Sequence, residues 1–257
     1  MRRLLLIAGL VATAGGGVAA NDLCGTTVMG DLTLDHALVC SADGRVVGAD
    51  GIRIDLNGHV IAGSGAGVGV LVSGRSDVTV ANGVIRDFPV AVRIIASTGI
   101  IIRHNEFVEN AEGIDVQAGG VGNTIKDNVF RAHTIRAIML RGSSSDNDVK
   151  NNTFTGNRIG VLMFGATDSE LKDNLISGSS LAGIRFNVIA AGNTIKGNIL
   201  TSNLAAVDFV ITPTGSSIGN EFKGNTLSAN SCGFKGPTAG NTFKDDTFED
   251  NAADACS

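Results

Sequence analysis

Hydrophobic positions along the chain recur in short segments with polar residues between them, and the segments repeat. The stretch NTIKDNVF at residues 123–130 returns with small changes five more times, at 147–154, 169–176, 193–200, 220–227 and 241–248. Two apolar columns, five residues apart, run through nine repeats. The first column is Leu56, Val80, Ile102, Ile125, Val149, Leu171, Ile195, Phe222 and Phe243, and the second is Ile61, Ile85, Phe107, Phe130, Phe154, Ile176, Leu200, Leu227 and Phe248.

Most repeats also carry a third short apolar segment. These segments are GVLV 69–72, AVRI 91–94, GIDV 113–116, AIML 137–140, GVLM 160–163, GIRF 183–186 and AVDF 206–209. Their alternation has period two and none is long enough for a helix, which predicts strands. A period of about 23 residues with three strands is typical of a solenoid, and the fixed leucine spacing of a leucine-rich repeat is absent. The pattern therefore predicts an all-β fold, a single-stranded right-handed parallel β-helix of about nine to ten coils.

A polar column lies between the two apolar columns. Asparagine tolerates the left-handed backbone region, and its amide can donate to one neighbouring coil while accepting from the other. The column therefore predicts an internal asparagine ladder that also makes the turn, with Asn57-Gly58 and Asn82-Gly83 making it in the first two coils. Its members are Asn105, Asn128, Asn152, Asn174, Asn198, Asn225 and Asp246.

The first twenty residues do not belong to the repeat. They contain two arginines, an apolar run and small residues ending at Ala20, which predicts a secretory signal peptide over 1–20. We expect an N-terminal cap over 21–44 and the β-helix with its C-terminal cap over 45–257, in a secreted or periplasmic protein. Without Arg2 and Arg3, the 20 basic residues become 18 against 25 acidic ones, a net charge of -7. This balance argues against a nucleic-acid partner, and no other apolar run reaches the length of a membrane span.

Four cysteines in an exported chain predict two disulfides. Nine coils spaced by about 4.8 Å put the two ends about 40 Å apart. A disulfide requires Cα atoms within about 7 Å of each other. The expected pairs are therefore Cys24 with Cys40 and Cys232 with Cys256.

The GI-type strands and the N-x-hydrophobic-x-x-N units together resemble the secreted repeat proteins of the pectin-lyase-like superfamily. The strands are GIDVQ 113–117, GVLMF 160–164 and GIRFN 183–187, and the resemblance covers roughly residues 45–250. The group includes pectate lyases, polygalacturonases, alginate epimerases and a periplasmic copper-delivery accessory protein. The resemblance implies that a ligand lies along the sheet made by the GI-type strands. It does not select an activity, because such a scaffold hosts many functions.

Alternation along the GI-type strands predicts which side chains point outward. Arg93 lies one coil from Asp115, and Arg185 lies one coil from Asp208. These pairs are either cross-strand ion pairs or parts of a cleft for an acidic sugar, in which Phe164 is the outward aromatic ring. We favour the ion pairs, because no converging group with a perturbed environment is visible.

Candidates for catalysis are few and incomplete. Glu112 stands where polygalacturonase-like hydrolases carry an aspartate, but inverting hydrolysis needs a second acid, and none aligns. Arg136 or Arg141 beside Glu112 and Asp115 is the nearest match to a lyase base beside a calcium site, although two carboxylates are few for Ca²⁺. An alginate epimerase would need a tyrosine, and the chain has none. The weak catalytic set is therefore Arg93, Glu112, Asp115, Arg136 and Arg141.

The four histidines show no spacing that would form a metal cluster. We expect His36, His59, His104 and His133 on the surface or in turns, and we predict no metal site. Calcium is the one cofactor that the sequence leaves open.

Six of the seven lysines occupy the same position of the repeat, with Arg103 extending the row. The row is either a solvated face balanced by flanking acids or a track for a linear polyanion. We favour the solvated face, because the chain is acidic overall. The row contains Lys126, Lys150, Lys172, Lys196, Lys223 and Lys244.

The leading hypothesis for function is a non-catalytic structural or glycan-interacting protein of the cell envelope. Its expected partner is an acidic polysaccharide or another envelope component. The alternative is a polysaccharide lyase or epimerase that acts on an acidic, uronate-containing polysaccharide.

Overall fold

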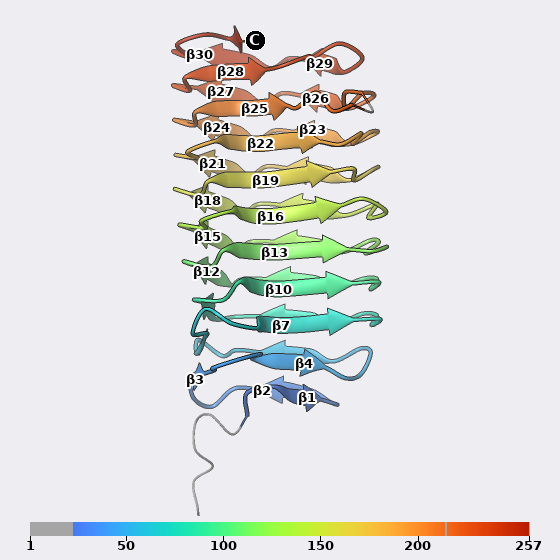
Figure 1. Cartoon of the computed structure of the whole chain (residues 1–257), viewed down its shortest axis with the longest axis vertical. Helices are drawn as coiled ribbons and strands as arrows, with labels where there is room; N and C mark the ends of the chain where they lie inside the picture. The colour runs from blue at the N-terminus through green and yellow to red at the C-terminus, as the bar shows by residue number, and fades with distance from the viewer. Residues whose placement is uncertain (1–22, 214, 257) are drawn as a thin grey trace, which may run out of the picture.

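The computed structural model describes residues 23–213 and 215–256, so the predicted signal peptide lies outside the described residues. The described residues form 31 strands and no helix. No segment in this part of the chain is therefore a helix able to cross a membrane. The strands wind into a parallel β-helix with its three sheets along the sides and its coils stacked one on another (Figure 1).

Each coil adds one strand to each of three sheets. Sheet A, which holds the GI-type strands, consists of β1 (Thr26–Val28), β4 (Arg45–Val47), β7 (Val68–Ser73), β10 (Val90–Ile95), β13 (Glu112–Gln117), β16 (Arg136–Arg141), β19 (Ile159–Phe164), β22 (Ala182–Asn187), β25 (Ala205–Phe209), β28 (Cys232–Lys235) and β31 (Ala255–Cys256). Sheet B consists of β2 (Leu32–Thr33), β5 (Arg53–Asp55), β8 (Thr79–Ala81), β11 (Ile101–Arg103), β14 (Thr124–Lys126), β17 (Asp148–Lys150), β20 (Glu170–Lys172), β23 (Thr194–Lys196), β26 (Glu221–Lys223) and β29 (Thr242–Lys244). Sheet C consists of β3 (Leu38–Val39), β6 (Val60–Ala62), β9 (Val84–Arg86), β12 (Glu106–Val108), β15 (Val129–Arg131), β18 (Thr153–Thr155), β21 (Leu175–Ser177), β24 (Ile199–Thr201), β27 (Thr226–Ser228) and β30 (Thr247–Glu249).

The two predicted apolar columns form the core. Equivalent residues pair in register between coils, as Ile125 does with Ile102, and their side chains are buried. The rings of Phe107, Phe130 and Phe154 stack with centroids 4.9 and 4.8 Å apart. One assignment was wrong: Ile54, not Leu56, pairs with Val80. In this early coil the two column positions, Ile54 and Ile61, are seven residues apart, whereas Val80 and Ile85 in the next coil are five apart. The spacing of five therefore placed Leu56 in the column in error.

The predicted asparagine ladder is confirmed. In a middle coil, Asn128 donates from its backbone N and its Nδ2 to Asn152 Oδ1, at 3.0 and 3.1 Å, and Asn152 does the same toward Asn174. The ladder ends at Asp246, whose Oδ1 accepts from Asn225. The prediction that asparagines make the left-handed turn is confirmed for Asn57 (φ 49°) and Asn82 (φ 66°) but was wrong for the ladder asparagines of the later coils. That conformation belongs to the preceding residue, for example Asp127 with φ 56° and Asn151 with φ 55°.

Two further ladders, which the sequence analysis missed, lie at the other corners of the coil. In the first, Asn123 donates to Asn147 and Asn193 donates to Asn220. The other, which we call the third ladder, contains Asn110, His133, Asn157, Ser179, Asn203, Asn230 and Asn251. Most of these residues exchange hydrogen bonds with the next coil. A spacing of five residues, as in 193, 198 and 203, was the available signal.

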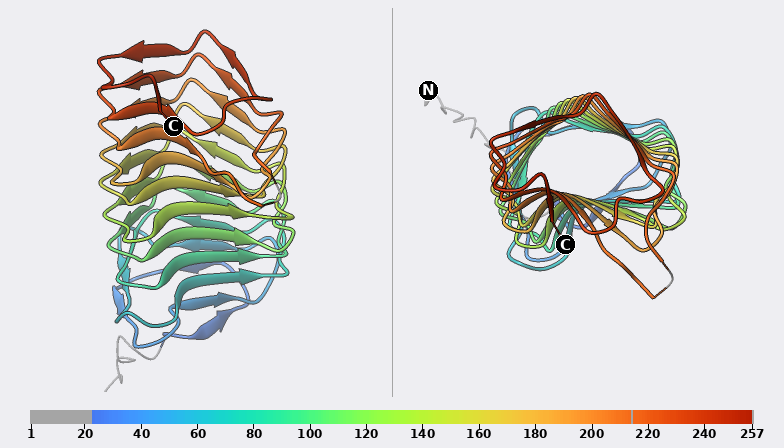
Figure 2. Two further views of the ribbon diagram at one scale, coloured as in Figure 1. Left: turned by 45° about the horizontal axis from the view of Figure 1, so that its top comes forward. Right: turned by 90° about the horizontal axis from the view of Figure 1, so that it is seen from above.

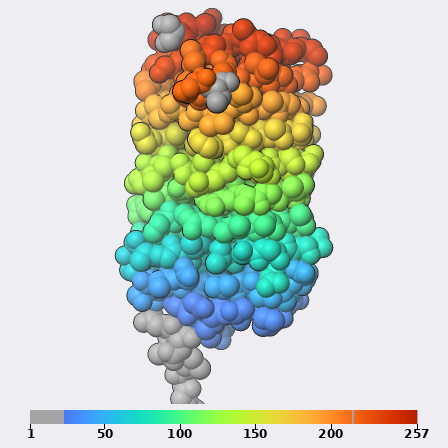
Figure 3. Space-filling view, turned by 45° about the vertical axis from the view of Figure 1, so that its right-hand side comes forward, coloured from blue at the N-terminus to red at the C-terminus, as the bar shows by residue number. Residues whose placement is uncertain are grey.

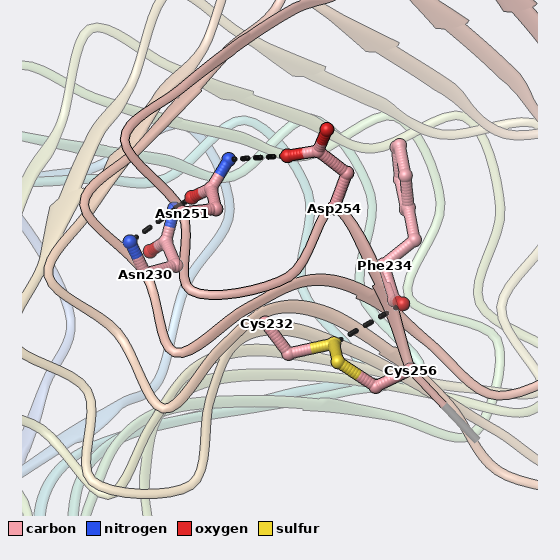
Figure 4. The surroundings of a disulfide bond; sticks show 6 residues. All are labelled: Asn230, Cys232, Phe234, Asn251, Asp254 and Cys256. Atoms are coloured by element: carbon pink, nitrogen blue, oxygen red, sulfur yellow. Dashed lines mark hydrogen bonds between the residues drawn. A yellow bond between two sulfur atoms is a disulfide. The ribbon is translucent and has the colours of Figure 1, made fainter.

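Disulfides join the two predicted cysteine pairs at opposite ends of the solenoid. Cys24 bonds to Cys40 with Cα atoms 5.5 Å apart, and Cys232 bonds to Cys256 with Cα atoms 6.2 Å apart. Beside the second disulfide, Asn251 closes the third ladder and donates to Asp254 (Figure 4). At the other end, the segment 21–44 that was expected to be a cap contains β1, β2 and β3, which pair with β4, β5 and β6 and so form a coil of the solenoid.

One coil is longer than the others. The ladder step from Asn198 to Asn225 spans 27 residues, whereas the steps on either side of Asn152 span 24 and 22. The additional residues follow β25, where Thr212 and Gly215 exchange backbone hydrogen bonds. Viewed along the axis, this orange segment projects beyond the outline of the other coils (Figure 2), and on the surface it stands out from the stacked bands (Figure 3). We call residues 210–213 and 215–217 the insertion.

Candidate functional site

The outer face of sheet A carries the candidate residues in the register that the sequence predicted. One row crosses the sheet, with Arg93 paired to Asp115, Leu162 to Arg185 and Arg185 to Asp208. Along this face three regions follow one another. They are a first polar cluster (Arg93, Glu112, Asp115, Gln117, Arg136, Arg141), an apolar strip (Met139, Ile159, Leu162, Phe164, Leu181) and a second polar cluster (Arg185, Asp208, Lys235).

Asp115 is the centre of the first polar cluster. Its side chain is 0% exposed although it lies on the outer face, because neighbouring long side chains cover it. Arg141 donates to both of its oxygens, from Nε at 2.8 Å and from Nη2 at 3.1 Å, and Gln117 donates to Oδ2. The hydrogen bonds from Arg141 also raise the pKa of that guanidinium. The carboxylate is thus saturated by donors on its own coil and the next.

Glu112 and Arg136 form a second ion pair in the same cluster. Arg136 Nη2 lies 2.6 Å from Glu112 Oε1, and both side chains are mostly buried. Glu112 Oε2 and Arg136 Nε make no hydrogen bond in the described structure. The pair is therefore covered from solvent yet keeps some hydrogen-bonding capacity.

Arg93 completes the first cluster and differs from the other two arginines. Its Nε lies 3.7 Å from Asp115 Oδ2, and no hydrogen bond joins its guanidinium to any described residue. The side chain remains 32% exposed. Three arginines face two carboxylates, so the cluster carries one excess positive charge. Arg93 is the arginine of the cluster whose guanidinium makes no hydrogen bond to a described residue.

The apolar strip separates the two polar clusters. Met139, Ile159 and Leu162 are buried on the outer face, outside the core of the solenoid, and pack with Phe164 and Leu181. Phe164 is half-buried, so part of its ring is available to solvent. The strip provides an apolar surface between two groups of cations.

The predicted ion pair of the second polar cluster is present. Arg185 Nε lies 3.3 Å from Asp208 Oδ2, and Asp208 is almost fully buried. Lys235 pairs with Asp208 in the strand register and is exposed. Two cations therefore accompany one carboxylate, which again leaves an excess of one positive charge.

The predicted lysine row runs along sheet B, away from this face. Lys126, Lys150 and Lys172 follow one another in register. Acids on the same sheet compensate part of the row: Lys150 lies 2.7 Å from Asp148 and Lys244 lies 3.0 Å from Glu221. The contact with Lys244 lowers the pKa of Glu221. The row is thus a mixed charged surface, with Lys126, Lys196 and Lys223 outside any ion pair among the described residues.

Histidines contribute nothing to these clusters. His133 lies in a turn as expected, but its side chain is buried in the third ladder with Nδ1 3.2 Å from Asn110 O. Burial disfavours the charged ring and lowers the pKa of His133 to about 4. In residues 23–213 and 215–256, no three His, Cys, Asp or Glu side chains gather in a group that could hold a metal ion.

Solved structures with this fold are numerous. The periplasmic alginate epimerase AlgG superposes with a TM-score of 0.66 at 16% identity, over 82% of this chain and 62% of that one. An alginate lyase from Paenibacillus sp. str. FPU-7 gives 0.66 at 11%, over 87% and 91% of the two chains. The tailspike protein of E. coli bacteriophage HK620, in complex with a pentasaccharide, gives 0.65 at 12%, over 86% and 50%. At such identities the likeness shows the right-handed parallel β-helix alone.

No curated protein matches the chain. A family does match, over residues 50–253, which cover nearly all of the coils described above. The chain belongs to the family described as periplasmic copper-binding protein (NosD).

Proposed function

We propose that the protein binds a linear acidic polysaccharide in the periplasm, along the outer face of sheet A, and does not cleave or epimerise it. The observation that carries the proposal is the guanidinium of Arg93, which forms an ion pair with Asp115 at 3.7 Å but donates no hydrogen bond to any described residue. It lies beside a carboxylate that other donors already saturate, and it is accessible to solvent. A guanidinium presents five donors in a planar fork that matches a carboxylate, so a uronate group is a fitting partner for it.

The apolar strip supports a sugar polymer over a small anion. Sugar rings present C–H faces that pack on apolar and aromatic surfaces, and the partly exposed side chains of Phe164 and Leu181 offer such a surface next to the cations. The two polar clusters lie at either side of the strip, so a chain with repeated carboxylates could contact both. The similar structures include an alginate epimerase, an alginate lyase and a tailspike protein in complex with a pentasaccharide, which supports a glycan ligand.

In the first polar cluster, the carboxylates and arginines already pair with one another, which argues against a role in catalysis. A general base must be able to accept a proton from the substrate, but both oxygens of Asp115 are bound by Arg141. Glu112 Oε1 already accepts a hydrogen bond from Arg136. Arg141 is itself held at a raised pKa by Asp115, which makes it a poorer base than a free arginine.

The copper named in the family description does not fit the described residues. Copper in proteins prefers imidazole, thioether and thiolate ligands. All four cysteines form disulfides, and of the described methionines Met139 and Met163 are buried and only Met29 is exposed. No three His, Cys, Asp or Glu side chains of the described residues gather in a group that could hold a metal ion. Copper therefore has no part in the proposed function.

The test measures retention on an acidic polymer. We expect the purified protein to bind polygalacturonate or alginate and not neutral dextran. Arg93→Gln should weaken binding about tenfold, because it removes a charge-assisted contact. Arg103→Gln is the matched control, since Arg103 lies on sheet B, and it should bind like the unmodified protein.

Unchanged binding by Arg93→Gln, or no binding of either polymer, contradicts the proposal. Absorbance of unsaturated uronate during the same incubations would instead support a lyase. Uronate epimer ratios measured by NMR before and after incubation would reveal an epimerase.

A further inference from the structure

We propose that the cavity at the base of the insertion is a separate subsite that holds a single carboxylate-bearing sugar, such as a uronate residue. The ligand class rests on the proposed function, but the residues are different from those of the first polar cluster. The subsite lies where β22, β25 and β28 end, beside the one coil that is longer than its neighbours.

The cavity is an open depression of a size suited to a small ligand. Its volume is about 290 Å³, and its lining includes Arg185, Asp208 and Lys235 together with residues of the insertion. Small-molecule pockets begin at about 300 Å³, so the cavity suits one sugar ring better than an oligosaccharide.

Arg185 supplies the unused hydrogen-bonding capacity. Its Nε is buried and without a hydrogen-bond partner, and the rest of its guanidinium donates to nothing else in the described chain. The nearby Asp208 oxygen, 3.3 Å from Nε, gives an ion pair without hydrogen-bond geometry. A mostly buried guanidinium left in this state gains free energy when an anion takes up its donors.

The charge balance selects a carboxylate over a neutral sugar. Arg185 and Lys235 lie on the strands at either side of Asp208, and Lys235 makes no ion pair within the described residues. Two positive charges against one negative charge leave an excess of one. A ligand with a single negative charge would balance it.

The walls provide the contact for the ring. Val210, Ile211 and Pro237 line the cavity on its apolar sides. Gly236 passes directly against Phe209: a Cβ at this position would lie 2.1 Å from the Phe209 carbonyl oxygen, and φ is +83°. Only glycine permits this close approach of the two segments, so the shape of this wall is set by the local sequence.

The experiment titrates the full exported chain with sodium galacturonate and follows its NMR spectrum, with galactose as the neutral control at matched ionic strength. We expect saturable binding of galacturonate and none of galactose. Lys235→Gln removes a cation without leaving a buried acid unpaired, so it should fold normally and lose about tenfold in affinity. Arg185→Gln should lose at least as much, and Arg103→Gln, on sheet B, should leave galacturonate binding unchanged.

The outcomes separate the subsite from the proposed function. Galacturonate binding that depends on Lys235 and Arg185 supports the subsite even if polymer retention fails. Polymer retention that depends on Arg93 but comes with no saturable galacturonate binding overturns the subsite and leaves the proposed function standing. Equal affinity for galactose, or galacturonate binding unaffected by Lys235→Gln, also overturns it.

Discussion

Arg141 donates two hydrogen bonds to the carboxylate of Asp115, from Nε to Oδ1 at 2.8 Å and from Nη2 to Oδ2 at 3.1 Å, between two neighbouring coils. Because Asp115 is 0% exposed, these bonds compensate a carboxylate that solvent cannot reach. The pair therefore stabilises the fold, and Arg93 is the arginine beside it that can bind a ligand.

Arg141→Met should destabilise the protein by about 3 kcal/mol, because it leaves the buried Asp115 without its principal partner. Arg131→Met is the control, since Arg131 pairs with Glu106 on the exposed face of sheet C, and it should cost less than about 1 kcal/mol. Urea unfolding at neutral pH measures both values. Equal small losses would show that Asp115 does not depend on Arg141.

The sequence predicted the fold well because a solenoid repeats its constraints in every coil. Each inward residue must match its neighbours, so Ile125 and Ile102 report the same position, and the ladder repeats with them. The error at Leu56 arose where a coil departs from the repeat. Repetition therefore explains both the success and its limit.

The candidate site was harder to predict, because it depends on features that do not repeat from coil to coil. Alternation placed Arg93 and Asp115 on one face, but it could not show that Asp115 is buried or that Arg141 saturates it, since both depend on side-chain conformations across coils. The cavity beside Lys235 lies at the base of the insertion, and the insertion has no counterpart in other coils. Departure from the repeat was the only signal that sequence could give there.

Asn152→Ala should cost about 1–3 kcal/mol in urea unfolding. Its side chain accepts from Asn128 and donates to Ile125 O and to Asn174, so its loss leaves buried groups on two coils without partners. Asn57→Ala is the matched control, because Asn57 is exposed and its amide makes one hydrogen bond, to Leu34 O. Equal costs at the two positions would contradict a ladder that stabilises the interior.

His133→Asn should reduce the loss of stability in acid. The pKa of His133 is lowered by burial to about 4 in the folded protein, against its ordinary 6.5. Between these values the unfolded chain binds a proton that the folded protein does not, so stability falls as the pH falls from about 6.5 to about 4. This titration lowers the free energy of unfolding by about 3 kcal/mol at pH 4 relative to neutral pH.

Urea unfolding of both proteins between about pH 7.5 and pH 4.5 measures this effect. Carboxylates also titrate in this range, but they do so in both proteins, and the difference between the two profiles isolates the histidine. Parallel profiles would show that the ring is not held neutral by burial.

Reversing three lysines of sheet B, as Lys150→Glu, Lys172→Glu and Lys196→Glu together, should leave binding of an acidic polymer to sheet A nearly unchanged. The row lies on another sheet and is partly balanced by acids such as Asp148. Exposed charges are screened beyond about 10 Å at 0.1 M salt. Retention on polygalacturonate at about 50 and 200 mM salt, compared with Arg93→Gln, gives the ranking. If the triple variant loses binding and Arg93→Gln keeps it, the polymer binds along the lysine row and the face of sheet A is only a set of ion pairs.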